Sequence, residues 1–280
     1  MIAFPARHLR RALIAAACAL PALLATPAAA YEPPPVNAGF DYQIGGDYPL
    51  PDGVSVVSRD WFSGRAAPDP TYSVCYVNAF QTQADEPGTD RPDEHSNWPR
   101  SLILEKLGDD PNWGGEYLVD ISTERKRERA AAWVGRMIQG CADGGFEAVE
   151  FDNLDSWTRF DGTPLARKVP FGKRDAIAFA TLIAARAHAL DLAVGQKNTV
   201  ELGAGARARV GFDFVIAEDC ARYHECDEYV RAYGAHVIAV EYREPLFRRT
   251  CDEIGDRVSV VLRDRLVSRP GARSYKFADC

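Results

Sequence analysis

The chain has 280 residues, of which 46% are hydrophobic, and its 40 Asp and Glu outnumber its 33 Lys and Arg, so its formal net charge is −7 at pH 7. This acidic balance argues against a nucleic-acid-binding protein, because phosphate contacts require clustered Lys and Arg, and it suits a neutral or cationic ligand. The length suits a single domain with one core.

The first 30 residues have the composition of an export signal. Residues 7–11 contain three Arg, residues 12–25 are apolar, and the small residues that follow predict cleavage after Ala30. The apolar region is too short and too rich in Ala to be a stable membrane anchor. Twin-arginine and lipoprotein signals are the alternatives, but the flanking residues that each requires are missing. We therefore predict a signal peptide at residues 1–30 and a secreted mature chain with a net charge near −10, because 30 basic and 40 acidic residues remain.

After a Pro-rich lead at residues 31–39, short apolar runs alternate with segments of helical periodicity. Residues 123–145 and 173–191 place their apolar side chains on one helical face. Strands that alternate with helices indicate βαβ units and a parallel sheet. We therefore predict that residues 40–280 form one α/β domain, a (β/α)8 TIM-barrel-like fold, with an open doubly wound sheet as the alternative. The strand-like runs are residues 40–46, 54–62, 73–80, 116–122, 146–153, 192–198, 213–220, 236–242 and 258–264.

Six cysteines remain after removal of the predicted signal, and an even number in an exported protein favours disulfides. Zinc is the competing interpretation, but no Cys-x-x-Cys pair occurs and His224 is the only histidine close to a cysteine. Fifteen pairings are formally possible. We expect Cys75 to pair with Cys141, Cys220 with Cys226, and Cys251 with Cys280.

Several of the predicted strands end on an acidic residue. The carboxyl ends of parallel barrel strands form the rim that carries the active site, so these acids are expected to gather there. Side chains alternate along a strand, so Glu150 and Asp152 share one face while Val149 and Phe151 face the helices. In such a cluster one acid can donate a proton while its ionised neighbour attacks or activates water, as glycoside hydrolysis requires. The acids are Asp60, Asp120, Glu150, Asp152, Glu218 and Glu241.

Structural roles compete with this interpretation. Asp60, Asp120 and Asp155 fit equally well as helix caps or ion-pair partners. Carboxylates also bind Mg²⁺ and Ca²⁺, and Lys197 could be the base of a metal-dependent barrel or could neutralise one of the acids. Because no metal motif occurs, we expect no metal and no cofactor. Aromatic residues near the strand ends could stack on sugars or anchor the core. They are Trp61, Tyr76, Trp98, Trp113, Trp157, Tyr223 and Tyr242.

Five segments of the chain resemble, in order and in character, glycoside hydrolase family 114, the endo-α-1,4-polygalactosaminidase-like proteins. The segments are WGGEYLVDIS, RMIQGCADGGFEAVEFDNLDSW, VGQKN, DFVIAEDCARYHECDEY and AVEY. The resemblance extends from about Phe40 to Cys280. It implies a (β/α)8-type barrel, often exported, that cleaves α-1,4-linked galactosamine-rich polysaccharide, and it supplies the expected partner, a galactosamine-containing polysaccharide.

The resemblance also implies site residues. The Asp of the family's Asp-Asn motif corresponds to Asp152, and the Glu before the first Cys of the paired-cysteine motif corresponds to Glu218. These two are the expected catalytic pair, with Asp152 as nucleophile or electrostatic stabiliser and Glu218 as acid/base. The chain departs from the family pattern at Phe151, where Pro is common, and at Asp219, where a second Glu is common. The expected sugar-binding residues are Tyr76, Asp120, Glu150, Asn153, Lys197, Asn198 and Glu241.

Two other classes of function remain compatible with the sequence. One is a carbohydrate-binding barrel without turnover, which an intact Asp152 and Glu218 argue against. The other is a metal-dependent lyase or phosphodiesterase barrel, which the small number of histidines argues against. We expect a monomer that binds no nucleic acid and has no stable membrane anchor.

Overall fold

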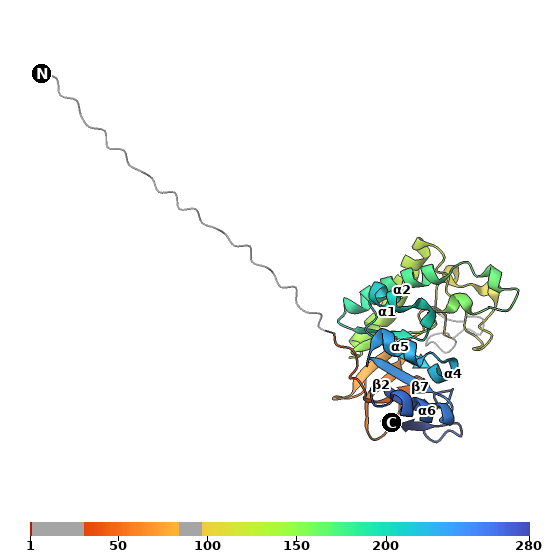
Figure 1. The fold of residues 1–280 in the computed structure, drawn as a ribbon. Helices are drawn as coiled ribbons and strands as arrows, with labels where there is room; N and C mark the ends of the chain where they lie inside the picture. Colours follow the sequence, from red (N-terminus) through yellow and green to blue (C-terminus); the bar gives the residue numbers. More distant parts are fainter. Residues whose placement is uncertain (2–30, 84–96) are drawn as a thin grey trace.

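The computed structural model describes Met1 and residues 31–83 and 97–280 (Figure 1). Apart from Met1, the predicted signal peptide lies outside the described residues. No helix in the described part of the chain is both long and apolar enough to span a bilayer.

A single mostly parallel sheet forms the centre of the molecule. Its strands follow one another in chain order, and the first eight are parallel, whereas β9 is antiparallel to β8. The sheet curves into a nearly closed barrel, which confirms the predicted TIM-barrel-like class. Its strands are β1 (Gly39–Gln43), β2 (Val54–Asp60), β3 (Tyr72–Val77), β4 (Ala148–Phe151), β5 (Ala193–Lys197), β6 (Phe214–Glu218), β7 (Val237–Glu241), β8 (Ser259–Arg263) and β9 (Phe277–Asp279).

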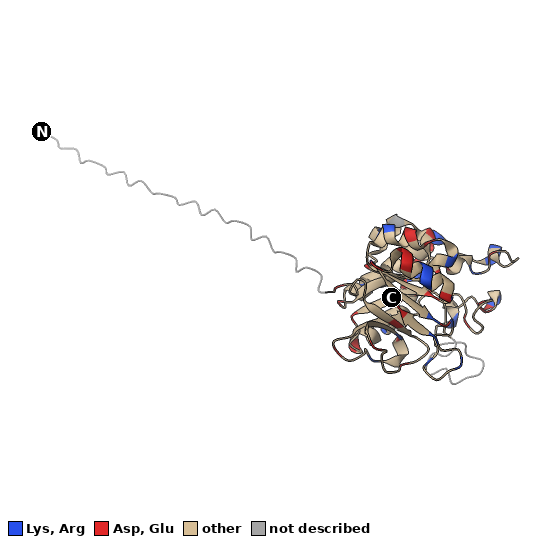
Figure 2. Ribbon diagram, turned by 60° about the horizontal axis from the view of Figure 1, so that its bottom comes forward, with Lys and Arg blue, Asp and Glu red and all other residues tan. Residues whose placement is uncertain are grey.

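Helices cover the outside of the sheet, and α1 packs beside α2 (Figure 1). The α-helices in the described residues are α1 (Glu124–Asp143), α2 (Lys173–His188), α3 (Ala204–Val210), α4 (Cys220–Tyr223), α5 (Cys226–Tyr233) and α6 (Glu244–Ile254). The 3₁₀ turns are Trp61–Ser63, Arg100–Leu102, Glu105–Leu107, Ser156–Thr158, Ala166–Lys168 and Val200–Leu202. Charged side chains lie mainly on the helices and loops, whereas the strands are mostly uncharged (Figure 2).

The connections from β1 to β2 and from β2 to β3, both fully described, contain no α-helix. Each is about the minimum length that a βαβ crossover requires, and the second is interrupted by Pro68 and Pro70. The barrel therefore departs from a strict alternation of strand and helix on this side.

One predicted strand is wrong. Residues 116–122 do not join the sheet. They form two isolated antiparallel bridges, Gln81 with Leu118 and Ile103 with Val119, together with further hydrogen bonds to the segments before them. Leu118, Val119 and Ile121 are buried in the core outside the barrel, which explains the apolar run. An apolar run indicates that a segment is buried, but it does not by itself show that the segment pairs with another strand. The other eight runs correspond to β1 to β8, and β9 was not predicted.

Side chains close the gap between β8 and β1, the two parallel strands that share no backbone ladder. The fully buried Arg263 donates from Nη1 to Asp41 Oδ1 at 2.6 Å and to the carbonyl oxygen of Tyr42. Its Nε and Nη2 donate to the carbonyl oxygens of Lys276 and Ser268 at 3.1 and 2.9 Å. Hydrogen bonds of the guanidinium group therefore join β8 to β1, where backbone hydrogen bonds do not.

The sheet separates two apolar layers, as the period-two alternation of its strands requires. Along β4, Val149 and Phe151 pack under the helices, which confirms the predicted orientation, whereas Ala148 belongs to the core inside the barrel. Glu150 is fully buried on the same inner face as Ala148. The inner face therefore carries both the barrel core and the functional side chains above it.

The protein contains three disulfides, and all three predicted pairings are confirmed. Cys75 to Cys141 joins β3 to α1, Cys220 to Cys226 closes the turn after β6, and Cys251 to Cys280 joins α6 to the residue after β9.

Candidate active site

A cavity of about 620 Å³ opens at the carboxyl ends of the strands. Eight acidic side chains line it, compared with four basic ones, so the cavity is acidic. The acidic residues are Asp60, Glu116, Asp152, Asp155, Glu201, Glu218, Asp219 and Glu225, and the basic residues are Arg159, Lys197, Arg222 and Arg265.

Three neighbouring strands reach this cavity through residues in the left-handed backbone region. Asn153 after β4, Asn198 after β5 and Asp219 after β6 have φ of 60°, 46° and 52°. Asn and Asp tolerate this region better than other residues with a Cβ, because their short polar side chains bond locally. The sequence pairs DN, KN and ED therefore mark where the chain turns away from each strand.

Asp152 follows β4 and both of its carboxylate oxygens accept hydrogen bonds. The Asn153 N–H donates to Oδ1 at 2.7 Å, and the Tyr76 hydroxyl donates to Oδ2 at 2.8 Å. The Asp152 N–H donates to the carbonyl oxygen of Val77 on β3 at 3.0 Å, which continues the strand pairing to the rim. The sheet thus fixes the position of this carboxylate.

Glu218 ends β6, and Asn198 holds it from two sides. Asn198 Nδ2 donates to Glu218 Oε2 at 3.0 Å, and the Glu218 N–H donates to Asn198 Oδ1 at 2.7 Å. The Tyr242 hydroxyl, one residue beyond β7, donates to Glu218 Oε1. Residues from three consecutive strands therefore hold this second carboxylate.

Lys197 lies between the two carboxylates and is almost fully buried. Its Nζ is 3.4 Å from Asp152 Oδ2 and 3.2 Å from Glu218 Oε2, and it donates to the Tyr42 hydroxyl at 2.9 Å. The two carboxylate oxygens therefore lie no further apart than the sum of these distances, 6.6 Å. One ammonium group holds both acids.

The charges of this group determine its pKa values. Burial raises the pKa of Asp152, but the Lys197 ammonium, the Asn153 N–H and the Tyr76 hydroxyl outweigh it and hold the pKa below its usual value. Burial lowers the pKa of Lys197, but Asp152, Glu218 and Glu150 together raise it above its usual value. Asp152 is therefore ionised and Lys197 is protonated at neutral pH.

Of the predicted site residues, the structure brings six together around the cavity. They are Asp152, Glu218, Tyr76, Asn153, Lys197 and Asn198. Asp60, which lines the cavity as well, accepts from the Phe62 N–H and thus begins the 3₁₀ turn after β2.

Glu150 lies below the cavity, inside the barrel. It accepts hydrogen bonds from Ser58 Oγ at 2.5 Å and from the Tyr42 hydroxyl at 3.2 Å, and burial raises its pKa to about 7 although Lys197 opposes the shift. At the neighbouring Gly195 an added Cβ would lie 2.7 Å from the Phe214 ring and 3.3 Å from Glu150 Cβ, so only glycine fits there.

Asp120 is not among the residues that line the cavity. Its segment does not join the sheet, and its carboxylate accepts from Ser122 Oγ and Lys126 Nζ, both at 2.6 Å. The contact with Lys126 ties this loop to the first turns of α1.

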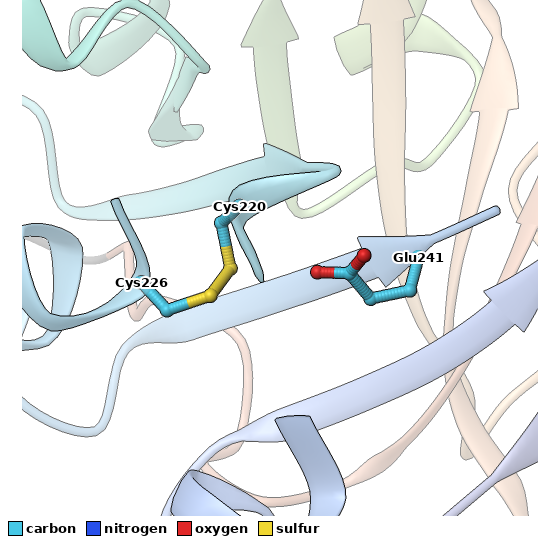
Figure 3. A group of neighbouring side chains, drawn as sticks. All are labelled: Cys220, Cys226 and Glu241. Atoms are coloured by element: carbon cyan, nitrogen blue, oxygen red, sulfur yellow. A yellow bond between two sulfur atoms is a disulfide. The ribbon is translucent and has the colours of Figure 1, made fainter. Parts of the chain in front are cut away.

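Glu241 is also not among the cavity-lining residues. It lies fully buried beneath α4, with its carboxylate next to the disulfide between Cys220 and Cys226 (Figure 3). Its Oε1 accepts from the Ala221 N–H at 2.9 Å, and burial raises its pKa to about 7. Within the described residues these three form the one group with metal-ligand spacing, but the two sulfur atoms are bonded to each other and cannot bind a metal.

Residues that were not predicted complete the site. Glu116 lines the cavity and accepts from Asn78 Nδ2 at 3.0 Å, and the Asn78 Oδ1 accepts from Asn153 Nδ2 at 2.9 Å. Arg159 donates to Asn153 Oδ1 at 2.7 Å from the other side. Tyr242 was among the aromatic residues expected near the strand ends. Asn78 and Glu116 lie in the expected strands 73–80 and 116–122 but were not singled out, and Arg159 lies outside the expected strands and helices.

Comparison with known proteins identifies the class to which this fold and site belong. The model of glycoside hydrolase family GH114 matches residues 21–276, so the chain belongs to this family and is a glycoside hydrolase. A search of curated protein sequences gave no match.

One of the solved structures that match supports the fold. The crystal structure of Aspergillus fumigatus Ega3 in complex with galactosamine aligns with a TM-score of 0.70 at 19% sequence identity, over 89% of this chain and 97% of that chain. An isomalto-dextranase of Arthrobacter globiformis T6 in complex with panose aligns with a TM-score of 0.41 at 15% identity, over 66% of this chain and 40% of that chain.

Proposed function

We propose that this glycoside hydrolase is an exported, endo-acting enzyme that cleaves α-1,4-linked galactosamine-rich polysaccharide, with Asp152 and Glu218 as its catalytic carboxylates. The observation that carries the proposal is the pair of carboxylates in one acidic cavity, held by a single buried ammonium group. Two carboxylates on either side of a glycosidic bond are the groups that most glycoside hydrolases use.

The surroundings of the two acids support different roles. Asp152 is kept ionised by three donors, as a nucleophile or a stabiliser of positive charge must be. Glu218, at the end of β6 and two strands away from Asp152, is then the acid/base. Retaining enzymes separate their carboxyl groups by about 5 to 5.5 Å and inverting enzymes by about 6.5 to 9.5 Å. The limit of 6.6 Å applies to one pair of oxygens, Asp152 Oδ2 and Glu218 Oε2, and is compatible with both ranges. We take the retaining mechanism, with Asp152 as nucleophile, as the form to be tested.

The substrate class follows from family and charge. The chain belongs to family GH114, and Ega3, which shares its fold, was crystallised with galactosamine. A deacetylated galactosamine unit carries a positive charge, and a cavity with twice as many acidic as basic side chains attracts cations. The three disulfides agree with export to an oxidising compartment.

The proposal is tested by incubating the mature protein with galactosamine-rich polymer, with and without EDTA, and measuring released oligosaccharides. Wild type is expected to release them whether or not the chelator is present. Asp152→Asn should lower kcat by about 10³-fold or more and Glu218→Gln by about 10²-fold or more, because each removes one of two cooperating groups. Proton NMR of the first products should show the α anomer.

Glu147→Gln is the matched control. Glu147 lies directly before β4, at the opposite end from Asp152, and accepts from the Ser73 N–H at 2.8 Å, which a Gln side chain can also do. It should keep wild-type activity. Binding of the polymer without any cleavage would instead support a carbohydrate-binding barrel, and loss of activity in EDTA would support a metal-dependent enzyme.

A further inference from the structure

The exposed hydrophobic side chains of this protein are unevenly distributed. Among the described residues, the large hydrophobic side chains that are exposed are Met1, Val36, Trp113, Leu182, Tyr223 and Leu266. Three of these six, Trp113, Tyr223 and Leu266, line the acidic cavity. Exposed apolar surface that gathers at one cavity is a feature of binding sites.

Tyr223 is the most exposed of the aromatic residues in this set, at 57%. It lies at the end of α4, which begins two residues after Glu218. The Arg222 guanidinium lies 5.2 Å from the centre of its ring and also pairs with Asp219 at 3.3 Å. The ring is therefore held by a neighbour and remains open to the cavity.

The segment that carries this ring, residues 219–226, is fixed at its base. The disulfide between Cys220 and Cys226 closes it, and the Glu225 N–H donates to the carbonyl oxygen of Cys220 at 2.9 Å. From below, Glu241 accepts from the Ala221 N–H. A ring presented on such a segment loses little conformational entropy when it binds a ligand.

The Tyr223 ring lies on the same side of the cavity as Glu218. Tyr223 lies five residues after Glu218, in the segment that follows β6, whereas Asp152 follows β4. In a retaining glycosidase the acid/base protonates the leaving-group oxygen, so the side of the acid/base is the side that binds the leaving-group sugar. A flat aromatic face binds the C–H face of a pyranose by dispersion and by attraction between the negative ring face and the C–H hydrogens.

We propose that Tyr223, on the disulfide-closed segment 219–226, forms a binding subsite for a sugar unit of the leaving-group side of the chain. This inference rests on the proposed function and on the acid/base role of Glu218. In this proposal the Tyr223 ring binds a sugar on the leaving-group side of the polysaccharide, and the disulfide fixes the position of the segment that carries the ring.

The test compares two substrates with Tyr223→Ala. One is the galactosamine-rich polymer, and the other is an oligogalactosaminyl fluoride, whose leaving group is a single fluorine atom that cannot reach the ring. We expect kcat/KM for the polymer to fall about five- to tenfold, the size of one aromatic stacking contact, and kcat/KM for the fluoride to stay unchanged. Tyr223→Phe, which keeps the ring, should behave like wild type.

Leu182→Ala is the matched control, because Leu182 is an exposed large hydrophobic residue on α2 outside the cavity. It should leave both substrates unaffected. An unchanged polymer rate in Tyr223→Ala, or an equal fall for both substrates, would overturn the subsite. If wild type cleaves neither substrate, the proposed function fails. The subsite is then tested by calorimetry of polymer binding, in which Tyr223→Ala must raise the Kd.

Discussion

Lys197 compensates the negative charge of several carboxylates near the carboxyl ends of the strands. Its ammonium group contacts Asp152 and Glu218 directly. Burial raises the pKa of Glu150, which lies deeper in the barrel, to about 7, and the ammonium group limits this rise. Removing one member of a buried charged group leaves its partners without compensation, which costs more than the contact itself stabilised. Lys197 is therefore a positioning residue for both proposed catalytic acids.

Replacing Lys197 with Met tests this role. Without the ammonium group the pKa of Asp152 rises, so Asp152 becomes protonated at higher pH and the acidic limb of the kcat/KM profile should move to higher pH. We expect kcat to fall by about 10²-fold, in line with the loss of a preorganised charge in an active site. The measurement is the pH profile of polymer cleavage beside that of wild type. A lower rate with an unmoved acidic limb would contradict the assigned electrostatic role.

At the scale of elements, the turn after β6 depends on a carboxylate that lies outside the cavity. Glu241 ends β7 and supports α4 through the Ala221 N–H, next to the disulfide (Figure 3). Because burial raises its pKa from 4.5 to about 7, the folded protein keeps a proton there that the unfolded chain has already released. This group therefore makes the protein less stable as pH rises from about 5 through about 7.

Glu241→Gln is expected to reduce that pH dependence. The amide oxygen can still accept from the Ala221 N–H, but no charge has to be buried at high pH. The loss in free energy of unfolding between pH 5 and pH 8 should therefore be smaller in the variant than in wild type, by about 1 to 3 kcal/mol. Urea unfolding at the two pH values measures the difference. Glu253→Gln, on the exposed side of α6, is the matched control and should leave the difference as in wild type. An equal pH dependence in Glu241→Gln and wild type would show that the carboxyl titrates normally.

At the scale of the whole molecule, the barrel is closed by side chains where the backbone ladder is missing. Arg263 and Asp41 form a fully buried ion pair between the last and the first parallel strand. One guanidinium group on β8 is thereby joined to β1, and it also donates to three carbonyl oxygens.

Arg263→Met should destabilise the protein by about 3 to 5 kcal/mol, because it leaves the Asp41 carboxylate buried without its countercharge. Adding Asp41→Asn removes that charge and should recover part of the loss, although the carbonyl oxygens remain without their donor. Urea unfolding of the two variants and of wild type measures both steps. Equal stability of Arg263→Met and wild type, or no recovery in the double variant, would contradict a closure by this pair.

Features that depend on local pattern could be predicted from the amino-acid sequence. Short apolar runs predicted β1 to β8, helical periodicity predicted α1 and α2, and the even number of cysteines in an exported chain predicted disulfides whose expected pairing is confirmed. It also placed Asp152 and Glu218 at strand ends, because the carboxyl ends of parallel strands must meet at one rim.

Which of the strand-end acids reach the cavity could not be predicted, because it depends on how distant segments pack. Glu150 and Glu241 are strand residues whose side chains point into the barrel and beneath α4, whereas Asp120 belongs to a segment that never joins the sheet. Asn78 and Glu116 enter the site through loops, whose course depends on packing between segments far apart in the chain. A strand pattern fixes which way a side chain faces, but burial depth and the distance between acids are set by how the sheet curves and closes.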